Sequence, residues 1–251
     1  MISPGSRHLR FILLSIVAGI SNMTLAMAEV RQARDTTRHT VLVISPRLNS
    51  TGHFPFTGAL INHHLNADIN IFYDRHPVGF FLFKSQDLQE KSIVNYLQPG
   101  VFATVKLSSQ LKVRGFFGYL LSQAEGFRDD DSDYYTAATV YWDIAPGFRL
   151  ENTALFYDLT LGTKLAERLL LSYQKKKYKL DLYVWHRMVL DEGNHSTSAM
   201  LAFTFPQIKI SDKTTLLLTS SYQSYLTTNR PGFALKNGFL FSLAMPITVL
   251  E

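Results

Sequence analysis

Apolar and polar residues alternate along most of this chain. In the stretch QLKVRGFFGYLL (110–121), Leu111 and Val113 alternate with Lys112 and Arg114. Successive side chains of a β-strand point to opposite faces, so this stretch has one apolar face and one charged face. The same alternation predicts strands at 55–64, 66–74, 77–84, 97–107, 110–121, 133–143, 147–157, 166–175, 178–189, 196–206, 213–223 and 236–248. We therefore predict an all-β chain with about 12 strands, within a range of roughly 10 to 14.

The lengths of the strands and of their connections favour a barrel that crosses a membrane. Many predicted strands have ten or more residues, whereas strands in soluble sheets have about five or six and tilted membrane strands about 9 to 11. Tight links at 144–147 and 175–177 alternate with longer ones at 85–96 and 122–133. An up-and-down antiparallel barrel in an outer membrane has short turns on the periplasmic side and longer loops outside. We therefore expect a transmembrane β-barrel of this kind.

The even strand number of bacterial barrels guides the interpretation of the N-terminal part. Single-chain outer-membrane barrels have an even number of strands, and both termini then lie in the periplasm. A strand at HTVLVISP (39–46) would break that rule. We therefore interpret 29–54 as a segment before the barrel and 55–251 as the barrel itself.

Residues 1–28 have the features of a cleavable signal peptide. Arg7 and Arg10 lie beside the short apolar run FILLSIVAGI (11–20), and AMA (26–28) supplies the small residues of a cleavage site. The apolar run is shorter than the roughly 20 residues needed to span a bilayer, which favours cleavage over an N-terminal anchor. The mature chain is therefore expected to leave the cytoplasm.

Composition excludes several kinds of site. The chain has 251 residues and no cysteine, so it has no disulfide, thiolate metal site or acylated cysteine. The formal charge is +5, and removal of Arg7 and Arg10 with the signal peptide leaves 23 basic and 20 acidic residues, or +3. Such a mild excess does not indicate a nucleic-acid partner.

The apolar face of the predicted strands is expected to meet lipid. A soluble periplasmic sandwich would show the same alternation, with the apolar face inside, so alternation alone does not decide. Aromatic residues recur near the predicted strand ends: Tyr73, Tyr119, Tyr134, Trp142, Phe148, Tyr173, Tyr178, Phe205 and Tyr222. Rings at both interfaces form the aromatic girdles of outer-membrane barrels. Closure of the sheet would also pair every backbone group in the hydrocarbon layer.

The chain resembles the small porin-like outer-membrane β-barrels of Gram-negative bacteria. The stretches VGFFLFKSQDL (78–88) and LENTALFYDLTL (150–161) are similar to segments of uncharacterised barrels of Bacteroidota. The resemblance implies a place in the outer membrane, with outer-membrane lipids, lipopolysaccharide, the barrel assembly machinery and small solutes as partners. Such barrels commonly end in an aromatic residue, whereas this chain ends in Val249, Leu250 and Glu251.

Candidate catalytic and metal-binding residues are few. His195 and Ser196, in HSTS (195–198), could suggest a lipid hydrolase, but adjacent strand residues point to opposite faces and cannot easily form a nucleophile–base pair. HH (63–64) diverges in the same way, and DDDSD (129–133) lacks the spacing of an EF-hand. We predict no catalytic residue, no metal site and no cofactor. A Ser/His lipid hydrolase stays a lesser alternative.

The polar face of the strands is expected to line the lumen. Its candidate selectivity residues are Lys106, Lys112, Arg114, Arg149, Glu151, Arg168, Lys179, Asp181 and Arg187. Basic residues outnumber acidic ones in this set, and rings of cations in a pore favour anions. The predicted function is passive diffusion of small anionic solutes, with Lys112 and Arg114 dominant because no acid lies on their own strand. The alternative is a structural or accessory barrel with a plugged lumen.

Overall fold

The computed structural model describes residues 40–90, 94–122, 132–160, 162–190, 192–229 and 237–250. The expected signal peptide, residues 29–39 and the acidic run 129–131 lie outside these ranges. The strands are β1 (Thr40–Asn49), β2 (Gly52–Phe54), β3 (Ala59–Asn62), β4 (Asn66–Arg75), β5 (Val78–Asp87), β6 (Asn95–Lys106), β7 (Leu111–Ser122), β8 (Asp133–Ala145), β9 (Phe148–Tyr157), β10 (Lys164–Lys175), β11 (Tyr178–Val189), β12 (His195–Thr204), β13 (Ile208–Lys209), β14 (Thr215–Thr228), β15 (Asn237–Ala244) and β16 (Ile247–Leu250). None of the described residues forms a helix long and apolar enough to cross a membrane.

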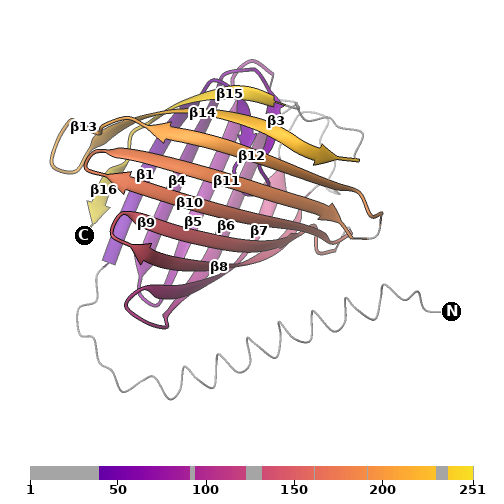
Figure 1. Ribbon diagram of the computed structural model, residues 1–251, viewed down its shortest axis with the longest axis horizontal. Coiled ribbons are helices and arrows are strands. Elements are labelled where there is room, and N and C mark those ends of the chain that lie inside the picture. The colour runs from indigo at the N-terminus through magenta and orange to yellow at the C-terminus, as the bar shows by residue number, and fades with distance from the viewer. Residues whose placement is uncertain are drawn as a thin grey trace. The chain divides into compact units, whose positions relative to one another are not determined.

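Twelve of these strands close into an antiparallel barrel (Figure 1). From β4 to β12 each wall strand pairs with the next one in the chain, β12 pairs with β14, and β14 pairs with β15. Closure is made by β1, which pairs with β4 along its whole length and on its other side with β15 and β16. The predicted up-and-down transmembrane β-barrel is confirmed.

The two faces of the wall are the reverse of those in a soluble protein. Apolar side chains such as Leu182, Leu201 and Phe239 are 42%, 53% and 62% exposed on the outside. Polar side chains such as Asp181 and Gln223 are 4% and 1% exposed on the inside. An exposed apolar belt of this extent is stable only against hydrocarbon, so the apolar face is the one that meets lipid.

The two ends of the barrel differ as the alternating connections predicted. At one end, here called the terminal end, β1 begins and β16 ends, and turns of two residues join β4 to β5, β8 to β9 and β10 to β11. Gly147 and Lys176 adopt positive φ angles of 81° and 55° in two of these turns. The other end, here called the loop end, has the longer connections. Most of the long connections lie at the loop end, but the connection 205–214, which contains β13, lies at the terminal end.

The boundary at residue 55 was wrong. Thr40–Asn49, placed before the barrel from the sequence, is wall strand β1, with ten residue pairs to β4. The predicted wall strand at 55–64 is instead part of a hairpin, because Pro55 and Gly58 lie in a turn between β2 and β3. The two errors cancel in the strand count, so the number of wall strands is still twelve.

The segment 50–65, here called the plug, folds into the lumen from the loop end. Its apolar residues Ala59 and Ile61 pack with Phe83 and Tyr96 of the wall in one buried cluster. The Thr51 hydroxyl donates to the carbonyl oxygen of Phe239 at 3.0 Å. Burial of these apolar groups against the wall's inner face keeps the hairpin inside the barrel.

The lipid-facing assignment can be tested by placing a charge on the outer wall. Leu182 pairs with Leu171 and Leu201 on the exposed apolar face, so Leu182→Arg should lower the free energy of unfolding in lipid vesicles by about 2–4 kcal/mol. The matched control is Asn70→Arg on the inner face, where Asn70 is exposed beside a cavity, and it should cost much less. Equal losses would show that the two faces are wrongly assigned.

Candidate functional site

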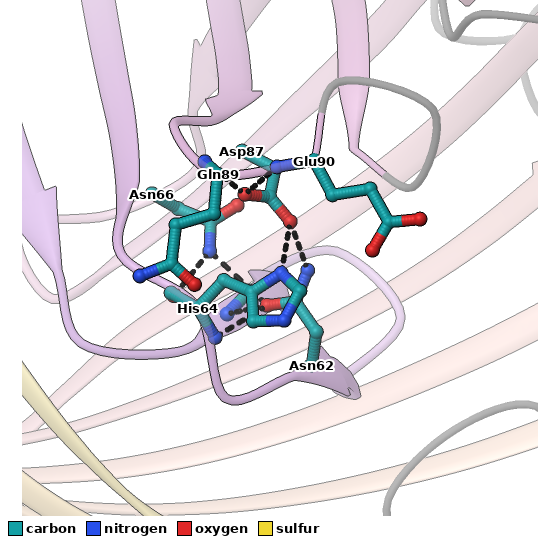
Figure 2. A network of polar contacts seen from close by, with 7 residues as sticks. Asn62, His64, Asn66, Asp87, Gln89 and Glu90 are labelled. Atoms are coloured by element: carbon teal, nitrogen blue, oxygen red, sulfur yellow. Dashed lines mark hydrogen bonds and ion pairs between the residues drawn. The ribbon is translucent and has the colours of Figure 1, made fainter.

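A buried carboxylate anchors the plug to the wall at the loop end. Asp87, the last residue of β5, is fully buried. Its Oδ2 accepts hydrogen bonds from Asn62 Nδ2 at 2.7 Å and lies 2.8 Å from His64 Nδ1, as Figure 2 shows. Its Oδ1 accepts from the backbone N–H groups of Gln89 and Glu90 at 2.7 and 2.9 Å. A carboxylate with this many donors is well compensated for its burial.

Asn62 ties the two ends of the hairpin together. Its Oδ1 accepts from the backbone N–H of Gly52 at 2.9 Å and of His64 at 3.2 Å. Asn66 at the start of β4 donates from Nδ2 to the His64 carbonyl oxygen at 2.6 Å (Figure 2). The start of the plug, its end and the wall strands β4 and β5 therefore share one hydrogen-bond network.

The turn of the plug is held on the opposite wall. Trp185 Nε1 donates to the Pro55 carbonyl oxygen at 3.3 Å, and Gln223 Nε2 donates to that of Gly58. Gly58 has a φ of +66°, and a Cβ there would lie 2.3 Å from Trp185 Cδ2. Trp185 is itself only 1% exposed. Only glycine fits this turn against the indole ring.

His53 is an uncharged group inside the plug. Its ring lies edge-on to that of Trp185 at a centroid distance of 5.8 Å. Its Nε2 is buried with no hydrogen-bond partner among the described residues. Burial, followed by the positive charge of Arg47, lowers the pKa of His53 to about 3. The imidazole is therefore neutral while the plug is docked.

Three of the cavities lined by described residues follow one another through the lumen. A loop-end cavity of about 350 Å³ and a central cavity of about 350 Å³ share Phe56 of the plug in their walls. A terminal-end cavity of about 540 Å³ is lined by Arg149, Glu151 and Lys179. Glu151 Oε2 lies 3.9 Å from Arg168 Nη2, which joins the terminal-end cavity to the central one. The plug therefore narrows the lumen between its loop end and its centre.

The central cavity carries paired charges. Arg47 donates to Asp68 Oδ2 through Nη2 at 2.7 Å and through Nε at 3.1 Å. Arg114 donates to Asp74 Oδ2 at 3.1 Å and to Thr104 Oγ1 at 2.8 Å. Its guanidinium carbon also lies 4.3 Å from the centroid of the Phe102 ring. These partners reduce the charge that either arginine presents to a solute.

The structure changes the expected status of Arg114. It was predicted to act as an unopposed cation because its own strand carries no acid, but Asp74 reaches it from β4. Arg149 pairs with Asp143 at 2.6 Å rather than with Glu151. Lys179 pairs with Asp181, two positions along its own strand, at 2.9 Å. Partners from neighbouring elements, rather than residues two positions along the strand, neutralise most of these cations.

Two lysines near the terminal end are without an acidic partner. Lys106 and Lys112 lie directly opposite each other on β6 and β7. Neither forms an ion pair within the described ranges, and the Lys112 Nζ lies 5.0 Å from the centroid of the Tyr141 ring. At the loop end, Arg187 donates to the hydroxyls of Ser196 at 3.1 Å and Tyr225 at 2.5 Å. The nine predicted lumen residues therefore include both neutralised and unpaired cations.

The residues considered for catalysis and metal binding do not form a site. The Ser196 hydroxyl is buried and is bound by Arg187, whereas the ring of His195 lies near that of His186, with centroids 6.2 Å apart. Among the described residues, no group of three or more His, Cys, Asp and Glu could hold a metal ion. The described polar residues instead form a charged lumen.

Three charged groups and the plug were not predicted from the sequence. Asp74 and Asp143 each lie an even number of positions from other inward-facing residues of the same strand. The alternation of the strand could therefore have placed both side chains in the lumen. Arg47 was missed because its segment was placed before the barrel, although Ser45, Arg47 and Asn49 alternate with apolar residues. The plug has no comparable signal, since its apolar residues resemble those of a wall strand.

Comparisons with known proteins identify the fold. No protein-family profile and no curated protein matches the chain. A KdgM porin superposes with a TM-score of 0.57 at 8% identity, over 82% of this chain and 98% of that one. A NanC porin gives 0.55 at 10% identity over 82% and 98%, and a COG4313 outer-membrane channel from Pseudomonas putida F1 gives 0.52 at 10% over 84% and 96%.

This chain has the fold of the small outer-membrane porins. The barrel and these neighbours support a place in the outer membrane. The three neighbours are two porins and an outer-membrane channel. The similarity of 78–88 and 150–161 to barrels of Bacteroidota stays a prediction.

The neutral state of His53 predicts that acid loosens the plug. Its pKa is about 3 when docked and about 6.5 when exposed, so docking is fully stabilised above pH 6.5 and weakens as the pH falls toward 3. In a Trp142→Phe background, Trp185 is the only tryptophan, and its emission should shift to longer wavelength below about pH 6. His53→Leu should abolish this shift. An identical shift in that variant would show that another group titrates.

The close fit of Gly58 predicts that a side chain there displaces the plug. Gly58→Leu should destabilise docking by about 1–3 kcal/mol or more through overpacking, and amide exchange across 52–62 should accelerate. Gly193→Leu is the control, because Gly193 has a φ of +68° and no atom within 4 Å of its added Cβ. It carries the same backbone strain without the clash. Similar exchange in both variants would mean that contact with Trp185 does not hold the turn.

Proposed function

We propose that this protein is an outer-membrane channel for passive diffusion of small anionic solutes. The fold of the small porins supports a channel. A KdgM porin of the same fold has also been solved in complex with disordered oligogalacturonate. The anion preference rests on the charges of this chain's own lumen.

The supporting observation is the positive charge that is left in the lumen once its ion pairs are taken into account. In the central and terminal-end cavities, each acidic side chain in the lining has a basic partner. These pairs are Asp68 with Arg47, Asp143 with Arg149, and Glu151 with Arg168. Lys106 and Lys112 are unpaired within the described ranges and leave a positive excess. A confined lumen with low-dielectric walls focuses that field on a passing ion.

The plug supports a second candidate, a structural barrel whose lumen stays closed. The hairpin is held through Asp87, Trp185 and Gln223, on three different wall strands. Ion conductance of the purified protein in planar bilayers separates the two candidates. Stepwise currents support the channel, and a correctly folded barrel without currents supports the structural role.

Location and assembly complete the proposal. We place the terminal end, with both termini, in the periplasm and the loop end at the cell surface, because short turns lie on the periplasmic side of bacterial barrels. A cleavable signal peptide over 1–28 would deliver the chain for export. Outer-membrane lipid, lipopolysaccharide and the barrel assembly machinery are the partners that follow. Ser/His catalysis is not part of the proposal, because Ser196 is bound by Arg187.

The unpaired lysines predict the ion selectivity. Replacing Lys106 and Lys112 together by glutamate should reverse the sign of the reversal potential in a salt gradient. The effect should shrink as salt rises, because screening shortens the field. We omit Arg114 from this variant, since its ion pair with Asp74 and its contact with Phe102 stabilise the wall.

The control for this variant makes the same charge change outside the lumen. Lys176→Glu with Lys177→Glu alters the exposed turn between β10 and β11 at the terminal end. It should leave the reversal potential nearly unchanged. If the two double variants shift the potential equally, the selectivity comes from the surface field and not from the lumen lysines.

A further inference from the structure

The central cavity combines an aromatic wall with basic groups. Its lining includes Phe56 from the plug and Phe72, Phe81, Phe116 and Tyr141 from the wall. The rings of Phe81 and Phe116 meet edge to face, with centroids 5.8 Å apart. At about 350 Å³, the cavity lies within the size range of small-molecule sites. Such a wall favours a solute with an apolar ring over one covered with hydroxyl groups.

Three arginines line this cavity, but two of them are already engaged. Arg47 makes two hydrogen bonds to Asp68, which also accepts from Asn49 at 2.6 Å. Arg114 is held by Asp74 and Thr104 and lies against the ring of Phe102. Each of these two arginines therefore forms a locally neutral pair with an aspartate.

Arg168 is the arginine with unused hydrogen-bonding capacity. Its Nε is buried, and no described residue accepts a hydrogen bond from it. Its Nη2 makes only long contacts, 3.3 Å to Thr153 Oγ1 and 3.9 Å to Glu151 Oε2. A buried guanidinium N–H without an acceptor is costly, and a carboxylate is the acceptor that matches its planar fork.

We propose that the central cavity binds an aromatic monocarboxylate, whose carboxylate accepts from Arg168 and whose ring packs against the phenylalanines. This inference rests on the proposed channel function and names its solute class. A single carboxylate fits because only one of the three arginines lacks a close acidic partner. A dianion would leave its second charge facing the aromatic wall and the acids of the neighbouring pairs.

The test measures equilibrium binding to the folded full-length mature chain in detergent. Benzoate is the probe, titrated by saturation-transfer NMR and compared with acetate, benzyl alcohol and cyclohexanecarboxylate. Benzoate should bind most tightly. Acetate lacks the ring, benzyl alcohol lacks the charge, and cyclohexanecarboxylate lacks the π-system, so each should be weaker. Acetate binding as tightly as benzoate would overturn the role of the aromatic wall.

Two variants and one control locate the site. Arg168→Gln should weaken benzoate binding about 10- to 100-fold, the range expected for loss of a charge-assisted hydrogen bond. Phe116→Leu keeps the wall apolar and should narrow the preference for benzoate over cyclohexanecarboxylate. Lys179→Gln removes a lumen cation at the terminal end and should leave benzoate binding unchanged. Wild-type affinity in a folded Arg168→Gln barrel would overturn the proposal.

Binding and conduction are measured separately, so each proposal can fail alone. A barrel that binds benzoate but carries no current refutes the channel and leaves the site in place. A barrel that conducts small anions but does not bind benzoate refutes the site and leaves the channel. Heat-dependent gel mobility confirms that each variant is folded before it is compared.

Discussion

Closure of the sheet by β1 is the constraint on which the rest of the structure depends. Backbone N–H and C=O groups in hydrocarbon require internal partners, and only a closed barrel leaves no open edge. β1 supplies this closure by pairing with β4 on one side and with β15 and β16 on the other. Once the sheet is closed, strand parity sends Leu182 and Leu201 toward lipid and Asp181 toward the lumen. The strand directions then place most of the long loops at one end.

Burying so many polar groups inside the barrel imposes a second requirement. Charges removed from water need partners, and the lumen supplies them across strands: Arg47 with Asp68, Arg114 with Asp74, Arg149 with Asp143. This pairing stabilises the wall but also reduces the field available to act on solutes. Among the described residues, the capacity for selectivity therefore falls chiefly to Lys106 and Lys112, which form no ion pair, and to Arg168, whose acidic partner Glu151 is 3.9 Å away. In this lumen, the closely paired side chains stabilise the wall, and the cations without a close partner are the ones that can act on solutes.

The plug is the part of the chain where local preferences yield to tertiary contacts. Gly58 has a positive φ against the Trp185 ring, and His53 is held neutral with an unpaired Nε2. At the other end of the hairpin, the carboxylate of Asp87 lies within hydrogen-bonding distance of four nitrogen atoms. A segment anchored at both ends and fitted tightly at its turn gives a narrow lumen its shape. Substitutions at Gly58, His53 or Asp87 can therefore change the shape of the lumen while the pairing of the wall strands is preserved.

The sequence by itself determined the class of fold, the lipid-facing side and most wall strands, because alternation has a period of two and needs no knowledge of distant partners. Strand parity also predicted an inward position for Arg168, which lines the central cavity, but Arg47, Asp74 and Asp143 were missed. The sequence did not distinguish the wall strand at 40–49 from the plug hairpin at 52–62, because both are partly apolar stretches of similar length and only the hydrogen bonds to β4 and β15 separate them. Nor did it show that Asp74 neutralises Arg114, which lies 40 positions away along the chain. Pairing across a closed barrel depends on tilt and register, and these are properties of the tertiary structure.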